Sequence, residues 1–278
     1  MALFNCKFHP TATDGIKNPE NTRMVKNVII ETMNLKDKVA IVTGASSGIG
    51  EATARLFCKN GAKLALAARS IDKLETLSKE LPNSLVIQTD MTKENDIKAM
   101  VRKTKDHFGR IDVLVNNAGR GYDASIEDTK IDAFREIIDL DLIGPVIAMQ
   151  QVIPIMKEQG GGTIINISSG TALMFLPNMA AYSSVKRALV GIGLTAREEL
   201  KADKIAVSVV YPYITMTDFE KNTVKASERD WSSEDNEEEE GNGAPFKPDT
   251  AEYVAQKIVE GIESGEAEVF VHDWMKKP

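Results

Sequence analysis

Cysteine and histidine are scarce in this chain of 278 residues, which holds two of the first and three of the second. Cys6 and Cys58 cannot build a disulfide framework, and so few cysteines are typical of a reducing compartment. The histidines lie far apart, and no spacing of Cys, His and Asp is typical of a metal site. We therefore expect a cytoplasmic protein without a bound metal.

Long apolar runs and an excess of positive charge are missing as well. No run of about 18 apolar residues occurs, so we expect no membrane span. The formal net charge is −7, which argues against nucleic acid or an anionic membrane as a partner. Residues 1–34 lack the continuous apolar core of a secretory signal. We interpret them as a loosely ordered extension, with room for one short helix near Arg23–Met33.

From Lys38 onward, short apolar runs alternate with longer helical patterns. The runs are continuously apolar, which is typical of parallel strands covered on both faces. They are Val39–Thr43, Lys63–Ala68, Ser84–Thr89, Ile111–Asn116, Thr163–Ser168, Ile205–Val210 and Ala267–Val271. The alternation predicts an α/β fold, a doubly wound Rossmann arrangement with a seven-stranded parallel sheet and helices on both faces. We expect one catalytic domain of this type over residues 35–278.

An acidic insertion interrupts the alternation at 213–247. Within it, Glu228–Glu240 holds eight acidic residues and one arginine. Such a run repels itself and stays solvated, which favours a surface insertion. Long loops in compact domains are often functional, so the flanks of the insertion are also candidates for a lid over the substrate. Both interpretations stay open.

A glycine-rich turn follows the first expected strand and leads directly into a helix. Residues 43–50 read TGASSGIG. Glycines let the backbone turn tightly and approach a pyrophosphate, and a helix N-terminus favours an anion. Strand, turn and helix in this order predict a dinucleotide site. The expected contacts are Gly44, Ser46, Ser47, Gly48, Ile49 and Gly50.

The end of the second expected strand bears on which nicotinamide cofactor binds. Enzymes that use NAD usually place an acid there for the ribose 2′-hydroxyl. Here Arg69 follows the strand, and the first carboxylate is that of Asp72. A guanidinium binds a 2′-phosphate through paired donors, so we expect NADP(H) to be preferred over NAD(H). The alternative is that Arg69 simply faces water.

Four motifs in order resemble the short-chain dehydrogenase/reductase family. They are TGASSGIG at 43–50, NNAG at 116–119, NISS at 166–169 and YSSVK at 182–186. The chain is similar to the single-domain TGxxxGxG/YxxxK branch over residues 35–271. The resemblance implies interconversion of a carbonyl and a secondary alcohol by hydride transfer. It also implies that Ser169 orients the substrate and that Asp90 contacts the adenine ring. Further cofactor contacts are implied for Met91, Asn116, Ala118, Gly119, Tyr182, Lys186 and Thr217.

Tyr182 and Lys186 have a physical case of their own. They are four residues apart in a helical pattern, so they share one face of the helix. A tyrosine is a poor base at neutral pH, but a nearby ammonium and an oxidised nicotinamide favour its phenolate. A tyrosine tuned in this way can donate a proton to a carbonyl or accept one from an alcohol. We expect both residues to be catalytic, and we expect Ser168 to be structural.

Two positions depart from the family pattern. Asp141 stands where the family has an asparagine that supports a water in the proton relay through a helix bend and its backbone carbonyl. We keep Asp141 as a candidate catalytic residue, because a carboxylate near Lys186 would raise the lysine pKa. Tyr213 stands where the family has a glycine, and it either narrows the substrate cleft or packs beneath the lid.

Two other functions stay open, because a fold does not fix an activity. The chain is either an enzyme, with NADP(H) or NAD(H), or a catalytically silent protein that senses NADP(H). A third possibility is an epimerase or dehydratase that uses the cofactor transiently. The apolar stretch around Leu173–Leu176 suggests a hydrophobic or mixed small-molecule substrate. The family commonly pairs through its long helices, so the resemblance implies a homodimer or homotetramer.

Overall fold

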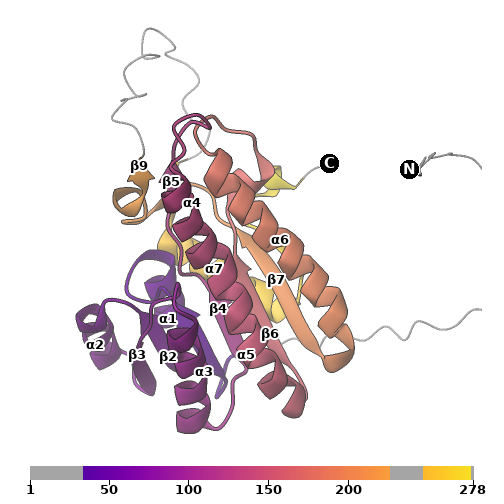
Figure 1. Cartoon of the computed structure of the whole chain (residues 1–278). Coiled ribbons are helices and arrows are strands. Elements are labelled where there is room, and N and C mark those ends of the chain that lie inside the picture. Colours follow the sequence, from indigo (N-terminus) through magenta and orange to yellow (C-terminus); the bar gives the residue numbers. More distant parts are fainter. Residues whose placement is uncertain (1–33, 226–246, 277–278) are drawn as a thin grey trace, which may run out of the picture.

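The computed structural model describes residues 34–225 and 247–276 (Figure 1). The expected N-terminal extension, including the helix near Arg23–Met33, and the acidic run Glu228–Glu240 therefore lie outside the described residues, apart from residue 34.

A seven-stranded sheet, parallel throughout, forms the centre of the fold. Its strands are β1 (Val39–Thr43), β2 (Lys63–Ala68), β3 (Ser84–Gln88), β4 (Val113–Asn116), β6 (Gly162–Ile167), β7 (Ile205–Tyr211) and β11 (Glu268–Phe270). They lie in the order β11-β7-β6-β4-β1-β2-β3. Helices cover both faces, so the central strands are buried along their whole length, as their continuous apolar sequences require. The expected fold class is confirmed.

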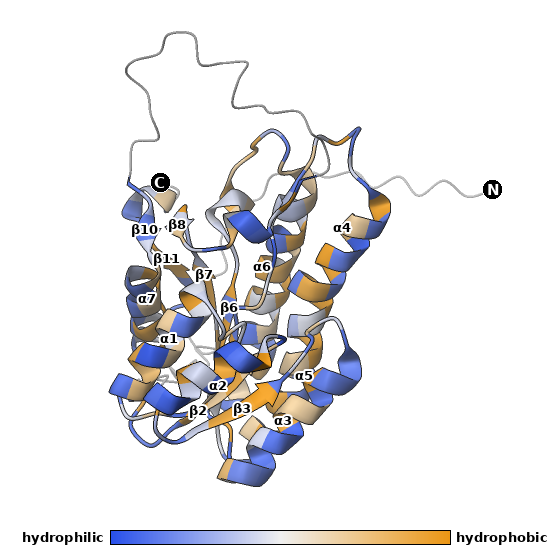
Figure 2. Ribbon diagram, turned by 90° about the vertical axis from the view of Figure 1, so that its left-hand side faces the viewer, coloured by the Kyte–Doolittle hydropathy of each residue, from blue (hydrophilic) through white to orange (hydrophobic). Residues whose placement is uncertain are grey.

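Two helical layers enclose two separate apolar cores, one on each face of the sheet (Figure 2). The helices of the first layer are α1 (Gly48–Lys59), α2 (Ile71–Glu80) and α7 (Ala251–Ser264). Those of the second layer are α3 (Glu94–Phe108), α4 (Ile131–Ile138), α5 (Gly144–Glu158) and α6 (Ala180–Leu200). From β1 the chain first moves outward through β2 and β3, and then crosses to β4 on the other side. The carboxyl ends of β1 and β4 therefore flank the point where strand order reverses, which is where such sheets bind ligands.

The long helical run before β6 is not one regular helix. A π-helical turn, η1 (Asp139–Ile143), separates α4 from α5. By length and composition alone, Ile131–Glu158 is apolar enough to cross a membrane, with a mean hydropathy of 1.4. Here it packs against α3 and α6 and carries the buried Asp141, as expected for a helix of an α/β domain.

Short strands attach the segment that follows β7 to the rest of the domain. Strand β8 (Thr215–Met216) pairs with β10 (Asp249–Thr250), and β9 (Val224–Lys225) pairs with β5 (Tyr122–Asp123). Four 3₁₀ turns complete the described fold: η2 (Gly170–Leu173), η3 (Lys201–Asp203), η4 (Glu220–Asn222) and η5 (Asp273–Met275). One flank of the expected insertion is thus fixed over the carboxyl end of the sheet.

Candidate active site

The glycine turn at the end of β1 has a backbone that only glycine fits. Gly44 and Gly48 adopt positive φ angles of 67° and 56°. A Cβ at Gly50 would lie 2.2 Å from the carbonyl oxygen of Gly44, and one at Gly44 would lie 2.8 Å from Asn117 Nδ2. The turn is therefore packed too tightly for side chains at these positions.

Thr43 and Asn117 hold this turn from behind, and the sequence analysis assigned neither of them a role. Asn117 Nδ2 donates to the Thr43 carbonyl at 2.8 Å. Thr43 Oγ1 accepts from the backbone N–H groups of Asn117 and Ala118 at 3.0 and 3.1 Å. These bonds couple the end of β1 to the end of β4. Both residues belong to motifs named above, TGASSGIG at 43–50 and NNAG at 116–119, and this membership was the sequence signal that could have identified them.

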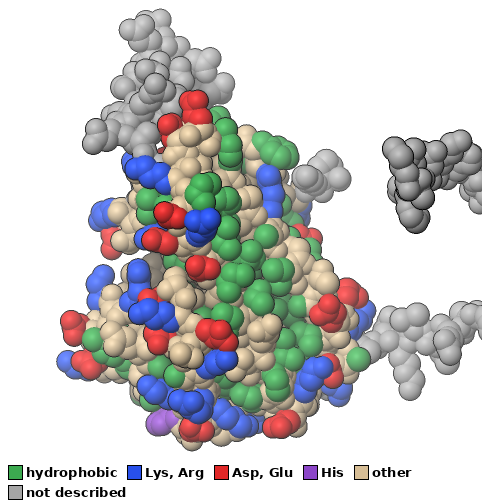
Figure 3. Space-filling model, in the orientation of Figure 1, with side chains coloured by type: hydrophobic (Ala, Val, Ile, Leu, Met, Phe, Trp, Pro, Cys, Tyr) green, Lys and Arg blue, Asp and Glu red, His purple; other side chains and the backbone are tan. Residues whose placement is uncertain are grey.

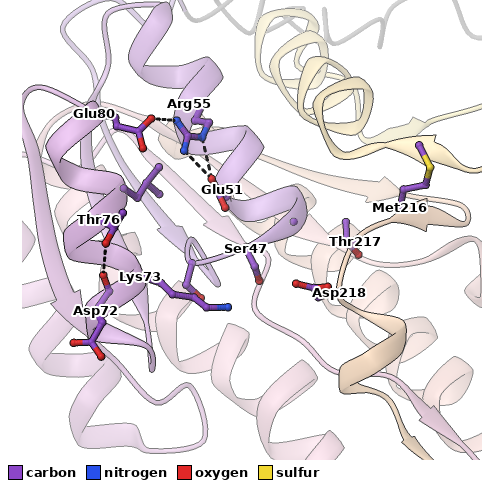
Figure 4. Close-up of a pocket in the computed structure, with 13 residues that line it drawn as sticks. Ser47, Glu51, Arg55, Asp72, Lys73, Thr76, Glu80, Met216, Thr217 and Asp218 are labelled. Carbon is purple, nitrogen blue, oxygen red and sulfur yellow. Dashed lines mark hydrogen bonds and ion pairs between the residues drawn. The ribbon is translucent and has the colours of Figure 1, made fainter.

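A cavity of about 710 Å³ opens beside the turn (Figure 4). Its walls come from the start of α1, from α2 and from Met216–Asp218. Ser46, Ser47 and Gly48 line it, so the N-terminus of α1 with its free N–H groups reaches the wall. Thr217 closes the other side, since a Cβ at Gly48 would lie 3.0 Å from Thr217 Cγ2. A glycine cradle next to a helix N-terminus fits the pyrophosphate of a dinucleotide.

The residues expected near the adenosine lie at the edge of this site. Arg69 directly follows β2, and its side chain is exposed. It is not one of the described residues that line the cavity. Asp90 Oδ1 accepts from the backbone N–H and the hydroxyl of Thr92 at 3.0 and 2.8 Å. Burial alone would raise the pKa of Asp90, but these bonds and nearby Lys93 and Arg69 lower it overall. Arg69 is thus close enough to Asp90 to lower the pKa of that carboxyl.

Other expected cofactor contacts are partly used for packing. Asn116 is buried, and its Nδ2 donates to Asn166 Oδ1 at 2.9 Å. The Met91 carbonyl lies against Gly144, where a Cβ would come within 2.3 Å of it. Ile49 packs against the core beneath the turn. These side chains set the spacing of the elements around the cleft.

Tyr182, Lys186 and Ser169 converge at the carboxyl end of β6. Tyr182 and Lys186 lie one turn apart in α6, and Lys186 Nζ is 5.7 Å from the centre of the Tyr182 ring. Lys186 Nζ also donates to the Ile167 carbonyl at 3.1 Å. Ser169 Oγ accepts from the backbone N–H and the hydroxyl of Thr171 at 3.2 and 3.0 Å. Its own hydroxyl proton is left for an acceptor other than Thr171, and Ser169 lies near enough to Tyr182 to lower the pKa of that phenol.

Asp141 joins this group from the π-helical turn. Its Oδ2 lies 3.1 Å from Lys186 Nζ, and its Oδ1 accepts from the backbone N–H of Arg120 at 3.1 Å. A π-helical turn inserts one residue into a helix, and such turns are frequent at functional sites. Here the turn aims an acidic side chain at α6. Gly119 passes the pair closely, since a Cβ there would be 2.8 Å from Asp141 Oδ2 and 3.3 Å from Lys186 Nζ.

Burial and charge shift all three titratable groups. Burial raises the pKa of Tyr182, and Asp141 raises it further, whereas Lys186 and Ser169 lower it in part. Burial would lower the pKa of Lys186, but Asp141 and Tyr182 outweigh it and the pKa is raised. Burial also raises the pKa of Asp141, and Lys186 offsets part of this. The group thus holds its protons more firmly than the same side chains would in water.

Aromatic residues cover the site. The Phe219 ring lies 6.1 Å from the Tyr182 ring, and only 5% of Tyr182 is exposed. Tyr213 has an ordinary negative φ and packs edge-on against Trp274 at 5.1 Å. Phe219 could not be identified from the sequence, because an aromatic residue in an irregular segment belongs to no recognisable motif. Of the expected apolar wall, Phe175 is 90% exposed and stacks on Arg187 instead.

Two further expectations concern the surroundings. The Ser168 hydroxyl is buried and donates to the Lys186 carbonyl at 3.1 Å, so it braces α6 against β6. Within residues 34–225 and 247–276, no group of three or more His, Cys, Asp or Glu side chains is arranged to hold a metal ion.

Known proteins resemble this chain over most of its length. The family described as short chain dehydrogenase matches residues 38–228. An uncharacterised oxidoreductase of Staphylococcus saprophyticus is 38% identical in an alignment of 189 residues that covers 66% of this chain and 77% of that protein. The mouse protein named dehydrogenase/reductase SDR family member 7B is 32% identical over 249 residues, covering 87% of this chain and 75% of the relative.

Solved structures share the fold as well. A 3-ketoacyl-(acyl-carrier-protein) reductase from Brucella melitensis, complexed with NADH, superposes with a TM-score of 0.75 at 26% identity, over 85% of this chain and 97% of that one. An alcohol dehydrogenase from Thermococcus sibiricus, complexed with 5-hydroxy-NADP, gives a TM-score of 0.73 at 25% identity, over 87% and 99%. With the family match over most of the described domain, these likenesses leave one assignment: the chain belongs to the short-chain dehydrogenase family, as an oxidoreductase that acts on CH–OH groups with NAD(P).

Proposed function

We propose that this protein is an NADP(H)-dependent oxidoreductase that interconverts a carbonyl and a secondary alcohol, with Tyr182 as its acid and base. The convergence of Ser169 with the buried Tyr182 and Lys186 carries the proposal. The glycine turn and its cavity belong to the same end of the sheet. A cofactor cradle and a proton donor at one sheet edge are the parts that hydride transfer to a carbonyl needs.

The side chains divide the work in a definite way. When bound, the nicotinamide cofactor supplies or accepts the hydride. In reduction, the Tyr182 hydroxyl gives its proton to the carbonyl oxygen, and in oxidation the phenolate takes it back from the alcohol. The Lys186 ammonium stabilises the phenolate that remains after reduction. Ser169, whose oxygen already accepts two bonds from Thr171, donates its own proton to the reacting oxygen.

The preference for NADP(H) rests on Arg69. Arg69 follows β2, the strand whose end usually contacts the adenosine ribose in this fold, and its side chain is exposed, which supports the preference. Arg69→Ala should weaken NADPH binding by about tenfold or more while leaving NADH binding unchanged. Arg102→Ala, an exposed change on α3, is the matched control. Tighter binding of NADH than of NADPH by the unaltered protein would contradict the preference.

A panel of aldehydes, ketones, sugars and steroids tests the activity. We expect at least one carbonyl to consume NADPH with formation of an equal amount of alcohol. NADPH binding without turnover across the panel would instead favour a silent sensing protein. Substrate conversion without net NADPH consumption would favour transient use of the cofactor, as in an epimerase or dehydratase.

We also propose that the chain forms a homodimer or homotetramer in the cytoplasm. Hydrophobic side chains gather over α5 and its border with α6 (Figure 3), and Ile143 beside this region is 43% exposed. An apolar face of this kind is typical of an interface between subunits. Sedimentation velocity should show a species of at least twice the chain mass, and Ile143→Glu should lower its share. A monomer at micromolar concentration would contradict the assembly.

A further inference from the structure

Asp141 and Lys186 form an ion pair in the interior of the domain. Their charged atoms are 3.1 Å apart, and their side chains are 0% and 5% exposed. A buried charge is costly unless it is paired and hydrogen-bonded. Both conditions are met here, because Asp141 also accepts from the Arg120 backbone and Lys186 also donates to the Ile167 carbonyl. The pair is therefore built into the fold.

The charge of this pair matters to Tyr182. A lone ammonium beside the phenol would lower the pKa of the phenol, because it stabilises the phenolate. Asp141 and Lys186 together share one ionisable proton and carry no net charge, wherever that proton sits between them. Groups coupled so tightly titrate as a unit, so the relevant quantity is the pH at which the whole group loses a proton.

We propose that Asp141 is a positioning residue that fixes Lys186 and weakens its positive field at Tyr182, so that Tyr182 stays in the protonated form that reduces a carbonyl. This inference rests on the proposed function and deepens it, since it explains how the acid is kept in its donating form.

The groups around Tyr182 support this assignment. Lys186 faces it from α6, Asp141 from the π-helical turn, and the uncharged Ser169 and Phe219 from the remaining sides. Arg120 is the next cation outward, and its guanidinium is paired with Glu136 at 2.8 Å. Asp141 is thus the acidic side chain that lies directly against Lys186. Asp141 raises the pKa of Tyr182 and also the pKa of Lys186. Both effects have the direction that the proposed role requires.

The pH dependence of Asp141→Asn tests the inference. The amide keeps the shape and an oxygen for the Arg120 N–H but removes the charge. For alcohol oxidation, the midpoint of the kcat/KM profile should move to lower pH by roughly one unit or more. For reduction, the loss of activity at alkaline pH should begin correspondingly earlier. Asp139→Asn, an exposed change on the same π-helical turn, should leave both profiles in place. Unmoved profiles in Asp141→Asn would overturn the inference.

A spectroscopic titration separates this inference from the proposed activity. The phenolate absorbance of the cofactor-free protein is followed against pH, and the same titration of the Tyr182→Phe variant is subtracted to isolate Tyr182. The difference should appear at a lower pH when both proteins also carry Asp141→Asn. This holds even if no substrate is found, so failure of the activity leaves the test intact. An identical titration with and without Asp141 would contradict the role.

A measurement on the unaltered protein covers the case in which Asp141→Asn does not fold. Lysine side chains labelled with ¹³C at Cε are titrated by NMR, and the Lys186 signal is assigned from the Lys186→Arg variant. Because the pair is intact, Lys186 should keep its proton to a higher pH than the exposed lysines. Loss of that proton below the exposed lysines would show that Asp141 does not act as its counter-ion.

Discussion

The backbone of Gly119 lies so close to Asp141 that a side chain does not fit between them: a Cβ there would stand 2.8 Å from Asp141 Oδ2. The same atom would be 3.3 Å from Lys186 Nζ. The ion pair is buried on all sides, so it has little freedom to yield. A glycine in the cofactor-binding motif thus also serves the proton-transfer group.

Gly119→Ala should therefore disturb catalysis more than folding of the sheet. We expect kcat to fall by about a hundred-fold, because a displaced Lys186 no longer supports the Tyr182 phenolate. Steady-state kinetics with the best carbonyl substrate measure this. Gly191→Ala is the control, since a Cβ at that exposed position of α6 would meet no described atom within 4 Å. Wild-type kcat in Gly119→Ala would show that the pair tolerates displacement.

The glycine turn makes a separate prediction about the cofactor. In Gly50→Ala the new methyl group would come 2.2 Å from the Gly44 carbonyl and 2.5 Å from Asn117 Nδ2. The turn must shift, and the N–H groups that face the cavity shift with it. We expect the Kd for NADPH, measured by the fluorescence of the bound cofactor, to rise about tenfold or more. The Gly191→Ala protein should bind as the unaltered protein does, and equal affinity in both variants would refute this role of the turn.

Phe219 makes a prediction about pH. Burial is the largest cause of the raised pKa of Tyr182, and the Phe219 ring is part of that cover. Phe219→Ala admits water, which favours the phenolate and lowers this pKa. The base form then exists at lower pH, so the profile of alcohol oxidation should move toward acid. Phe175→Ala removes an equal ring that is 90% exposed, and it should leave the profile in place. A shift of the same size in both variants would mean that Phe219 has no special place over Tyr182.

The sheet could be predicted because parallel strands that are buried on both faces have nearly continuous apolar sequences. The run Val39–Thr43 is apolar up to its last residue and is buried throughout, and the turn after it needs glycine because a side chain would not fit there. Such constraints are local and leave a local pattern. The spacing of Tyr182 and Lys186 places them on one face of a helix, but only the resemblance of the surrounding motifs to the family marked them as catalytic.

The family resemblance implied a helix bend at Asp141, but the apolar pattern did not show the π-helical turn, because one added residue barely changes the pattern of a long helix. The pairing of Asp141 with Lys186 depends on that turn, and it joins residues 45 positions apart in the sequence. The contact between Phe219 and Tyr182 is likewise long-range, and the pairing of β9 with β5 fixes the segment that follows Phe219. The geometry of these contacts was therefore set by tertiary packing, which leaves no local pattern in the sequence.

The central claim is that Tyr182 is the acid and base of a hydride-transfer enzyme. Single-turnover oxidation of bound NADPH by a carbonyl substrate in Tyr182→Phe tests it most directly, with Tyr253→Phe on α7 as the control. We predict that the rate falls by about two to four orders of magnitude in Tyr182→Phe, while the Kd for NADPH and the rate in Tyr253→Phe stay unchanged. A wild-type rate in Tyr182→Phe with NADPH bound would contradict the account.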